Sequence, residues 1–275
     1  MRATFVWLAA LCLGIPAEGQ QQIALTYSAA SIVNAASNQA GPLAPATFVS
    51  IYGAELSNVT RSISPDDIRG VLLPTILIGT GLRVLVNSVP ANIYYVSPGQ
   101  INFLMPTNLT PGVATVQVIV DGHAGQAAVV TVNAASPALF LMDGIHAIAV
   151  HADASLLTAE APGAPGETIV LYATGLGPTI PSIPYSQIPK NAGPLAELAS
   201  FRILLDGVEV DPARVAYAGI APGFAGLFQI NVKLPDTLPE HPEVRLRASG
   251  QISPTGVILF ARTPQPVASS VRSNY

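Results

Sequence analysis

Four polar residues near the middle of the chain are the best candidates for chemistry: Asp143, His146, His151 and Asp153. Imidazole and carboxylate groups are good metal ligands. His146 and His151 are five positions apart, so a regular strand would point them to opposite faces. His151 and Asp153 would share a face and could hydrogen-bond. Turn residues flank a short strand over 147–150. We weigh a metal site against a solvated hairpin between two modules, and the spacing favours the hairpin.

Asp66 and Asp67 offer adjacent carboxylates, which hard cations such as calcium prefer. No D-x-D-x-D-G spacing accompanies them. Ser64 and Pro65 just before them are instead typical of the start of a single helical turn. The pattern therefore favours a capped turn over a calcium site.

Nucleophile, zinc-protease and phosphate-loop motifs are missing from the chain, and Cys12 is its one cysteine. Gly79–Gly81 and Gly175–Gly177 are predicted to be turns, because neither completes a dinucleotide-binding motif. Carboxylate spacing alone leaves a glycosidase pair open, but most acidic residues precede Gly or Pro or lie in predicted loops. We predict a protein that is not an enzyme, with no catalytic, cofactor-binding or metal-binding residue and no cofactor.

Two amide pairs recur, Gln100 with Asn102 and Gln229 with Asn231. In a strand each pair shares one face while the intervening isoleucine takes the other. Such amides could bond loop backbone and fix a turn, or they could line a polar ligand site. Because the pair occurs twice, we favour the structural role.

Tyrosines supply the candidate binding surfaces. Tyr52 and Tyr172 lie in apolar strands, where a half-buried ring with its hydroxyl bonded to backbone is favoured over a binding platform. A sugar site built on Tyr94, Tyr95 or Tyr185 is the alternative, although Trp7, the one tryptophan, falls in the predicted signal peptide.

The elements that must position these residues are short strands. The chain has 25 prolines and 23 glycines, which break helices and punctuate strands. Strands are predicted over 115–120 and 128–132 around an Asp-Gly hairpin turn, and over 201–205 before another. Helix signals are weak, and Pro194–Ala199 is predicted to form one turn at most. The pattern predicts an all-β sandwich or barrel.

Three blocks occur twice in the same order, roughly 120 to 130 residues apart, which is too long for a solenoid repeat. The matched pairs are 47–56 with 167–176, 83–88 with 202–207, and 100–106 with 229–235. The repetition predicts duplicated domains. We place them at 27–135 and 136–264, followed by a disordered tail at 265–275.

Residues 1–19 are typical of a signal peptide: Arg2, an apolar stretch, and small residues before the predicted cleavage site. An uncleaved anchor is the alternative. No later stretch is long enough to span a bilayer. The net charge of −4 and the scarcity of lysine argue against nucleic acid as a partner.

The repeated motifs resemble a known family. Ser31–Ser37, Gly41–Pro45, Val49–Gly53, Tyr95–Phe103 and Tyr217–Asn231 are similar to the Solibacter-type (acidobacterial) uncharacterised C-terminal domain family. Its modules are similar to IPT/TIG-type Ig-like sandwiches. The resemblance covers most of residues 30–262 and implies two tandem Ig-like β-sandwich domains outside the cytoplasm, with no catalytic residues. Members often lie at the end of larger exported proteins, and this chain departs from that arrangement.

We therefore expect an exported, non-catalytic tandem module, secreted, periplasmic or at the cell surface. Its expected role is scaffolding, adhesion or macromolecule binding through the end loops. A carbohydrate-binding module is the alternative. The expected partner is an unknown extracellular protein or a polysaccharide, with no nucleic acid and no membrane span after signal cleavage.

Overall fold

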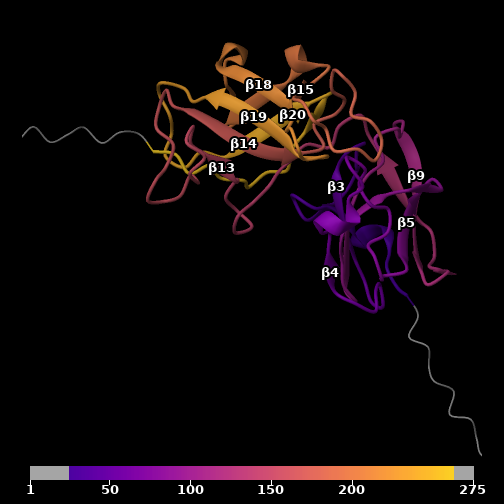
Figure 1. Cartoon of the computed structure of the whole chain (residues 1–275). Coiled ribbons are helices and arrows are strands. Elements are labelled where there is room, and N and C mark those ends of the chain that lie inside the picture. Colours follow the sequence, from indigo (N-terminus) through magenta and orange to yellow (C-terminus); the bar gives the residue numbers. More distant parts are fainter. Residues whose placement is uncertain (1–24, 263–275) are drawn as a thin grey trace, which may run out of the picture.

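The structure, a computed structural model, describes residues 25–262, which form an all-β protein of two tandem Ig-like β-sandwich modules (Figure 1). Strands β1–β11 make module 1 and strands β12–β21 make module 2. In Figure 1 the indigo-to-magenta strands gather in one lobe and the orange-to-yellow strands in the other. The predicted signal peptide and tail lie outside the described residues.

Module 1 packs a six-stranded antiparallel sheet against a five-stranded one. The first sheet has the order β2 (Gln39–Ala40), β1 (Ile32–Asn34), β3 (Phe48–Tyr52), β8 (Gln100–Leu104), β7 (Asn92–Val96), β4 (Arg61–Ser62). The second has the order β10 (His123–Ala124), β9 (Gly112–Val120), β5 (Leu82–Val86), β6 (Val89–Pro90), with β11 (Ala128–Val132) also paired to β9.

Module 2 repeats this plan. Its first sheet has the order β12 (Ala138–Leu139), β14 (Thr168–Thr174), β19 (Phe228–Lys233), β18 (Val215–Ile220), β15 (Gly193–Pro194), with β13 (Ala149–Val150) also paired to β14. Its second sheet has the order β17 (Val208–Glu209), β16 (Arg202–Leu205), β20 (Val244–Ala248), β21 (Gln251–Ile252).

Alternating aliphatic residues fill each core. Val84 of β5 and both Val116 and Val118 of β9 are fully buried between the two sheets of module 1. The predicted Asp-Gly turn follows β9, with φ of 48° at Asp121 and 82° at Gly122. Both residues are left-handed, as a two-residue hairpin turn requires. The alternation and the turn confirm the predicted hairpin.

Helical structure is limited to single turns of 3-10 helix within residues 25–262: η1 (Ala29–Ser31), η2 (Pro65–Asp67), η3 (Leu198–Ser200) and η4 (Pro212–Arg214). The turn predicted after Ser64 is confirmed as η2, which Ser64 caps. The single turn predicted over Pro194–Ala199 is present but begins later, as η3, because Pro194 itself pairs with Gly219 at a sheet edge, where a residue without an N–H is tolerated.

The two modules share their strand register. Tyr52 lies opposite Gln100 in module 1, as Tyr172 lies opposite Gln229 in module 2. The next strand shifts register between Ile93 and Tyr95 in module 1, and between Val215 and Tyr217 in module 2. A bulge at the same place in both sheets is the structural counterpart of the repeated sequence blocks.

A small hydrophobic cluster joins the modules. Buried Leu73 and Leu104 of module 1 meet buried Ala225 of module 2. The rings of Phe48 and Tyr94 pack edge to face beside them, with centroids 4.9 Å apart. This cluster lies outside both sandwich cores, so the modules bury surface against each other as well as internally.

Candidate functional site

The acidic and histidine candidates do not gather into one cluster, and only Asp143 and His146 bond each other. Nδ1 of His146 lies 2.6 Å from Oδ2 of Asp143, and its ring stacks on Phe260 with centroids 3.8 Å apart. Hydrogen bonds from the backbone and the side chain of His146, and from the backbone of Ile145, lower the pKa of Asp143 to about 2. This pair closes an exposed turn.

His151 has a partner that the sequence spacing does not reveal. Its Nδ1 lies 2.5 Å from Oε1 of Glu167, and its Nε2 lies 3.1 Å from the carbonyl oxygen of Ala161. The hydrogen bond with Glu167 raises the pKa of His151 despite partial burial. Asp153 instead accepts hydrogen bonds from the N–H and hydroxyl of Ser155. The predicted His151–Asp153 hydrogen bond is therefore wrong.

The hairpin around these residues is an edge of module 2 and does not separate the modules. Val150 of β13 lies opposite Val170 of β14, and this pairing brings Glu167 to the end of β13. Among residues 25–262, no group of three or more His, Cys, Asp or Glu side chains is placed to hold a metal ion.

Asp67 serves the fold. Both its carboxylate oxygens lie 2.9 Å from Nη2 of Arg61, and they also accept hydrogen bonds from the N–H and hydroxyl of Ser64 and the N–H of Ile78. Burial opposes ionisation, but the hydrogen bonds and Arg61 outweigh it and lower the pKa. The oxygens of Asp67 are therefore engaged in closing the turn η2, and Asp66 beside it is exposed.

The two amide pairs are built alike. Nε2 of Gln100 donates to Oδ1 of Asn102 at 2.8 Å, and Gln229 donates to Asn231 over the same distance. Each pair therefore shares one sheet face, as predicted. The amides bond each other, however, where loop backbone was the expected partner. Asn102 accepts a further hydrogen bond from the hydroxyl of Ser50.

The tyrosine candidates divide between the modules' junction and their sheets. Burial raises the pKa of Tyr94, whose ring packs in the junction cluster. The hydroxyl of Tyr185 donates to the carbonyl oxygen of Pro90 in the other module. Tyr95 lies opposite Asn102 in the ladder. Because Tyr94 and Tyr185 face the junction, the three do not form the alternative sugar platform.

Module 2 instead carries an open hollow on the outer face of its larger sheet. Its volume is about 400 Å³, and its lining is aromatic and aliphatic with one amide: Phe140, Ile148, Tyr172, Ala221, Pro222, Phe224, Leu227 and Gln229. None of these described residues is charged. Phe224 is 61% exposed, which is unusual for a phenylalanine.

The sheet register sets the floor of the hollow. The N–H of Phe140 bonds the carbonyl oxygen of Tyr172, and the N–H of Tyr172 bonds that of Ile148. Gln229 lies opposite Tyr172 on the neighbouring strand. Side chains from adjacent strands therefore stand side by side, with Tyr172 at the centre. Among residues 25–262, the hydroxyls of Tyr172 and Tyr52 have no hydrogen-bond partner, so the predicted backbone bonds are absent.

The wall of the hollow is the loop between β18 and β19. Its ends are closed by a hydrogen bond from the N–H of Ala221 to the carbonyl oxygen of Leu227, at 2.8 Å. Gly223 has φ of 83°, which glycine adopts without strain. The sequence reasoning missed Phe224, and the signal available was an aromatic residue directly after Pro222-Gly223 in a hairpin loop.

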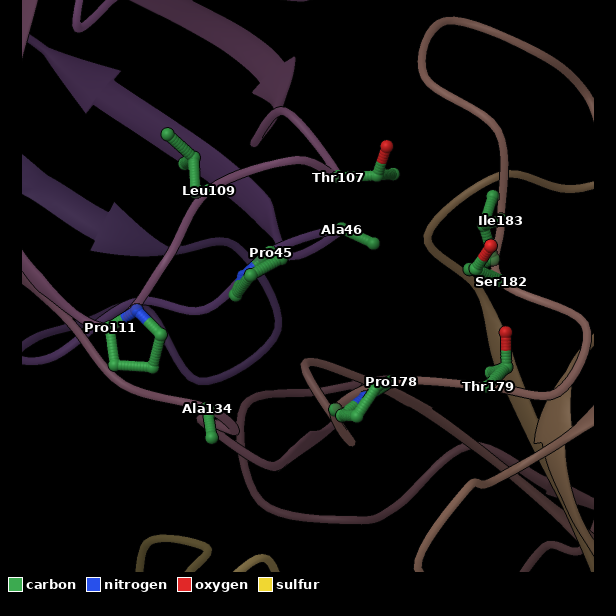
Figure 2. A pocket seen from close by; sticks show the side chains of 11 residues that line it. Pro45, Ala46, Thr107, Leu109, Pro111, Ala134, Pro178, Thr179, Ser182 and Ile183 are labelled. Carbon is green, nitrogen blue, oxygen red and sulfur yellow. The ribbon is translucent and has the colours of Figure 1, made fainter.

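A second cavity of about 210 Å³ lies in the crevice between the modules. Figure 2 shows Pro45, Ala46 and Leu109 of module 1 on one side, and Thr179 and Ile183 of module 2 on the other. Its eleven lining residues, all in the described part of the chain, include no acid, base or thiol. The hydroxyls of Thr107, Thr179 and Ser182 therefore have no acid or base among the lining residues to activate them as nucleophiles.

Comparison with solved structures finds β proteins at low similarity. The surface glycan-binding protein PbSGBP-B from Prevotella bryantii is 10% identical, with a TM-score of 0.27 over 86% of this chain and 42% of that chain. The Bacteroides ovatus mixed-linkage glucan utilization locus SGBP-B, in complex with a heptasaccharide, is 11% identical, with a TM-score of 0.32 over 81% and 44%. The tandem Ig repeats of Dlar are 10% identical, with a TM-score of 0.20 over 82% and 94%.

This chain spans less than half the length of the two glycan-binding chains. At these TM-scores the likeness carries no argument about a ligand, so the hollow is interpreted from its own side chains. No family model and no curated protein matches the chain, and the Solibacter-type resemblance stays a prediction. No helix within residues 25–262 has the length and apolarity to cross a membrane.

Proposed function

We propose that the protein is an exported, non-catalytic tandem Ig-like module that binds a neutral polysaccharide through the hollow of module 2. One observation carries the proposal. Three aromatic residues, Phe140, Tyr172 and Phe224, line an uncharged hollow beside the single amide of Gln229.

The chemistry of the hollow suits a sugar ring. The C–H face of a pyranose is apolar and packs on aromatic rings, while its rim of hydroxyls needs a few well-placed polar partners. Gln229 uses one Nε2 hydrogen on Asn231, which leaves its other amide hydrogen and its carbonyl oxygen for a ligand. The hydroxyl of Tyr172 can donate or accept. Because none of the lining residues is charged, the hollow favours a neutral sugar over an acidic one.

The shape of the hollow suits a polymer. Phe224 is 61% exposed at the rim, so a ring stacked on it stays open to solvent on the far side. A sugar unit within a longer chain can therefore lie against Phe224 without being enclosed. Export through residues 1–19 and the resemblance to the Solibacter-type family remain parts of the same proposal, and an extracytoplasmic location would give the module access to such polymers.

The test is retention on insoluble neutral polymers, for which amorphous cellulose, chitin and insoluble mannan serve as probes, followed by calorimetric titration with soluble oligosaccharides. We expect retention on at least one polymer. Phe224→Ala should weaken binding about tenfold, because one stacked ring is worth about 1.5 kcal/mol. Since Phe224 is exposed, the variant should keep the thermal stability of the parent.

The duplication supplies a matched control. Tyr52 lies opposite Gln100 as Tyr172 lies opposite Gln229, but the hollow is lined by residues of module 2 alone. Tyr52→Ala should therefore bind like the parent, while Tyr172→Ala should bind more weakly. Failure of every polymer to retain the protein would overturn the proposal, as would equal retention of Phe224→Ala and the parent.

A further inference from the structure

The loop that carries Phe224 is fastened at its far side to module 1. Ala225 is 2% exposed and packs in the cluster with Leu73 and Leu104. At Gly226, an added Cβ would lie 2.3 Å from Cδ1 of Leu104 and 3.1 Å from Cε2 of Phe48. The residues directly after Phe224 are therefore in close contact with the other module.

A second attachment lies just before Phe224. The N–H of Gly223 donates to the carbonyl oxygen of Pro189 at 2.8 Å. The chain leading to Pro189 pairs with module 1: the N–H of Ile188 bonds the carbonyl oxygen of Val71 at 2.8 Å, and the carbonyl oxygen of Ser186 accepts from Leu73. These backbone hydrogen bonds attach residues 186–188 to module 1, and the neighbouring Pro189 accepts the hydrogen bond from Gly223.

One buried hydroxyl connects the loop, the sheet of module 2 and module 1. Oγ1 of Thr174 donates to the carbonyl oxygen of Gly226 at 2.9 Å and accepts from the N–H of Phe48 at 3.0 Å. Thr174 is fully buried, so loss of its hydroxyl would leave the buried carbonyl of Gly226 and the part-buried N–H of Phe48 without this partner.

Module 1 has no such loop of its own. The chain turns from β7 to β8 over Ser97–Gly99, and the amide of Gln100 bonds straight back to Ser97. The corresponding connection in module 2 is the longer 221–227 loop, and its extra residues are those that contact the other module. Phe224 stands between the two attachments, exposed to solvent.

We propose that module 1 positions the 221–227 loop of module 2 for ligand binding. Phe48, Leu73 and Leu104 contact the residues directly after Phe224 and so keep its side chain in place. The inference rests on the proposed function of the hollow. A loop ordered before the ligand arrives loses less conformational entropy on binding, so the contact with module 1 raises affinity without touching the ligand. The two modules then have different roles at the same site: module 2 lines the hollow, and module 1 orders the loop beside it.

The decisive variant is Gly226→Ala in the full chain. Residue 226 has φ of 81°, and the added methyl group would collide with Leu104, so the loop must move away from module 1. Gly207→Ala is the matched control, because residue 207 has φ of 79° in a turn of module 2 with no heavy atom within 4 Å of an added Cβ. Both variants carry the same backbone strain, and only one disturbs the junction.

Hydrogen exchange without ligand is the first readout. The amides of Ala221 and Gly223 are hydrogen-bonded and should exchange slowly in the parent and in Gly207→Ala. In Gly226→Ala their protection should fall about tenfold or more, while β14 and β19 stay protected. Equal loop protection in Gly226→Ala and Gly207→Ala would overturn the inference.

Polysaccharide retention is the second readout. Gly226→Ala should bind more weakly than Gly207→Ala, and unchanged binding with a freely exchanging loop would also overturn the inference. If Gly226→Ala does not fold, Thr174→Val removes the bridging hydroxyl with little change in shape and is measured in its place. If the parent binds no polymer, the proposed function fails, and the exchange experiment still decides whether module 1 orders the loop.

Discussion

Nε2 of Gln229 donates a hydrogen bond to Oδ1 of Asn231 at 2.8 Å, two residues along the same strand. Gln100 and Asn102 make the same bond in module 1. The bond locks two amides on the outer face of each larger sheet. In module 2 it also orients the one amide that lines the hollow, so a structural role and the proposed binding role are compatible in the same residues.

The Gln100–Asn102 pair of module 1 should contribute more to the free energy of unfolding than the Gln229–Asn231 pair of module 2. Asn102 accepts from both Gln100 and Ser50, whereas Asn231, within the described part of the chain, accepts from Gln229 only. Asn102→Ala should lower the free energy of unfolding by about 1–3 kcal/mol and Asn231→Ala by about 0.5–1.5 kcal/mol, at the usual net value of a hydrogen bond. Urea denaturation measures both, and a larger loss in Asn231→Ala would contradict the assignment.

The His151–Glu167 pair predicts a loss of stability as pH rises. The hydrogen bond with Glu167 raises the pKa of His151. A group whose pKa is raised on folding stabilises the folded state below its ordinary pKa, and this stabilisation is lost as pH rises through the raised value. Urea denaturation between about pH 5.5 and about pH 8.5 spans the ordinary histidine pKa.

His151→Gln should flatten that pH dependence. His123 is exposed, so His123→Gln is the control and should keep the slope of the parent. A His151→Gln protein with the same slope as the parent would show that another group titrates there.

Glycines in turns predict changes of opposite sign. Gly122 has φ of 82° with open space around an added Cβ, so Gly122→Ala should lower the free energy of unfolding by about 1–2 kcal/mol through backbone strain alone. Gly41 has equal space but no left-handed φ. Gly41→Ala should therefore raise the free energy of unfolding by about 0.4–1 kcal/mol, because alanine reduces the conformational entropy of the unfolded chain. Thermal denaturation of the two variants compares them, and two equal losses would contradict this account.

Local patterns predicted the sheets well because strand alternation and turn chemistry depend on neighbouring residues. Val116 and Val118 alternate with polar residues, and Asp121-Gly122 has the conformation that its hairpin requires. The duplication was also visible, since a shared register preserves residue types at matched positions, as at Tyr52 and Tyr172.

The hollow and the junction were not predictable in this way. Phe140, Tyr172 and Phe224 come from three separate segments, and only the strand pairing brings them together. His151 similarly meets Glu167 because β13 pairs with β14, whereas spacing along the chain suggested Asp153. Tyr94 and Tyr185 face the other module, and no pattern within one module indicates how the two pack.

Asp67 predicts the largest single loss of stability. Its side chain is fully buried and pairs with Arg61 while it accepts from Ser64 and Ile78. Asp67→Ala should lower the free energy of unfolding by about 2–4 kcal/mol, because Ser64 and Ile78 lose a charged acceptor, while Arg61 is 26% exposed and water can solvate part of its charge. Asp66 is exposed next to it, so Asp66→Ala should stay within about 0.5 kcal/mol of the parent.

The pKa of Asp67 is lowered, because its hydrogen bonds and Arg61 outweigh the effect of burial. Its contribution to the free energy of unfolding should therefore be present above the ordinary aspartate pKa and be lost as pH falls below it. Urea denaturation at neutral and acidic pH measures these differences. Millimolar calcium should leave the Tm unchanged in both proteins, whereas a calcium-dependent rise lost in Asp67→Ala would restore the cation interpretation.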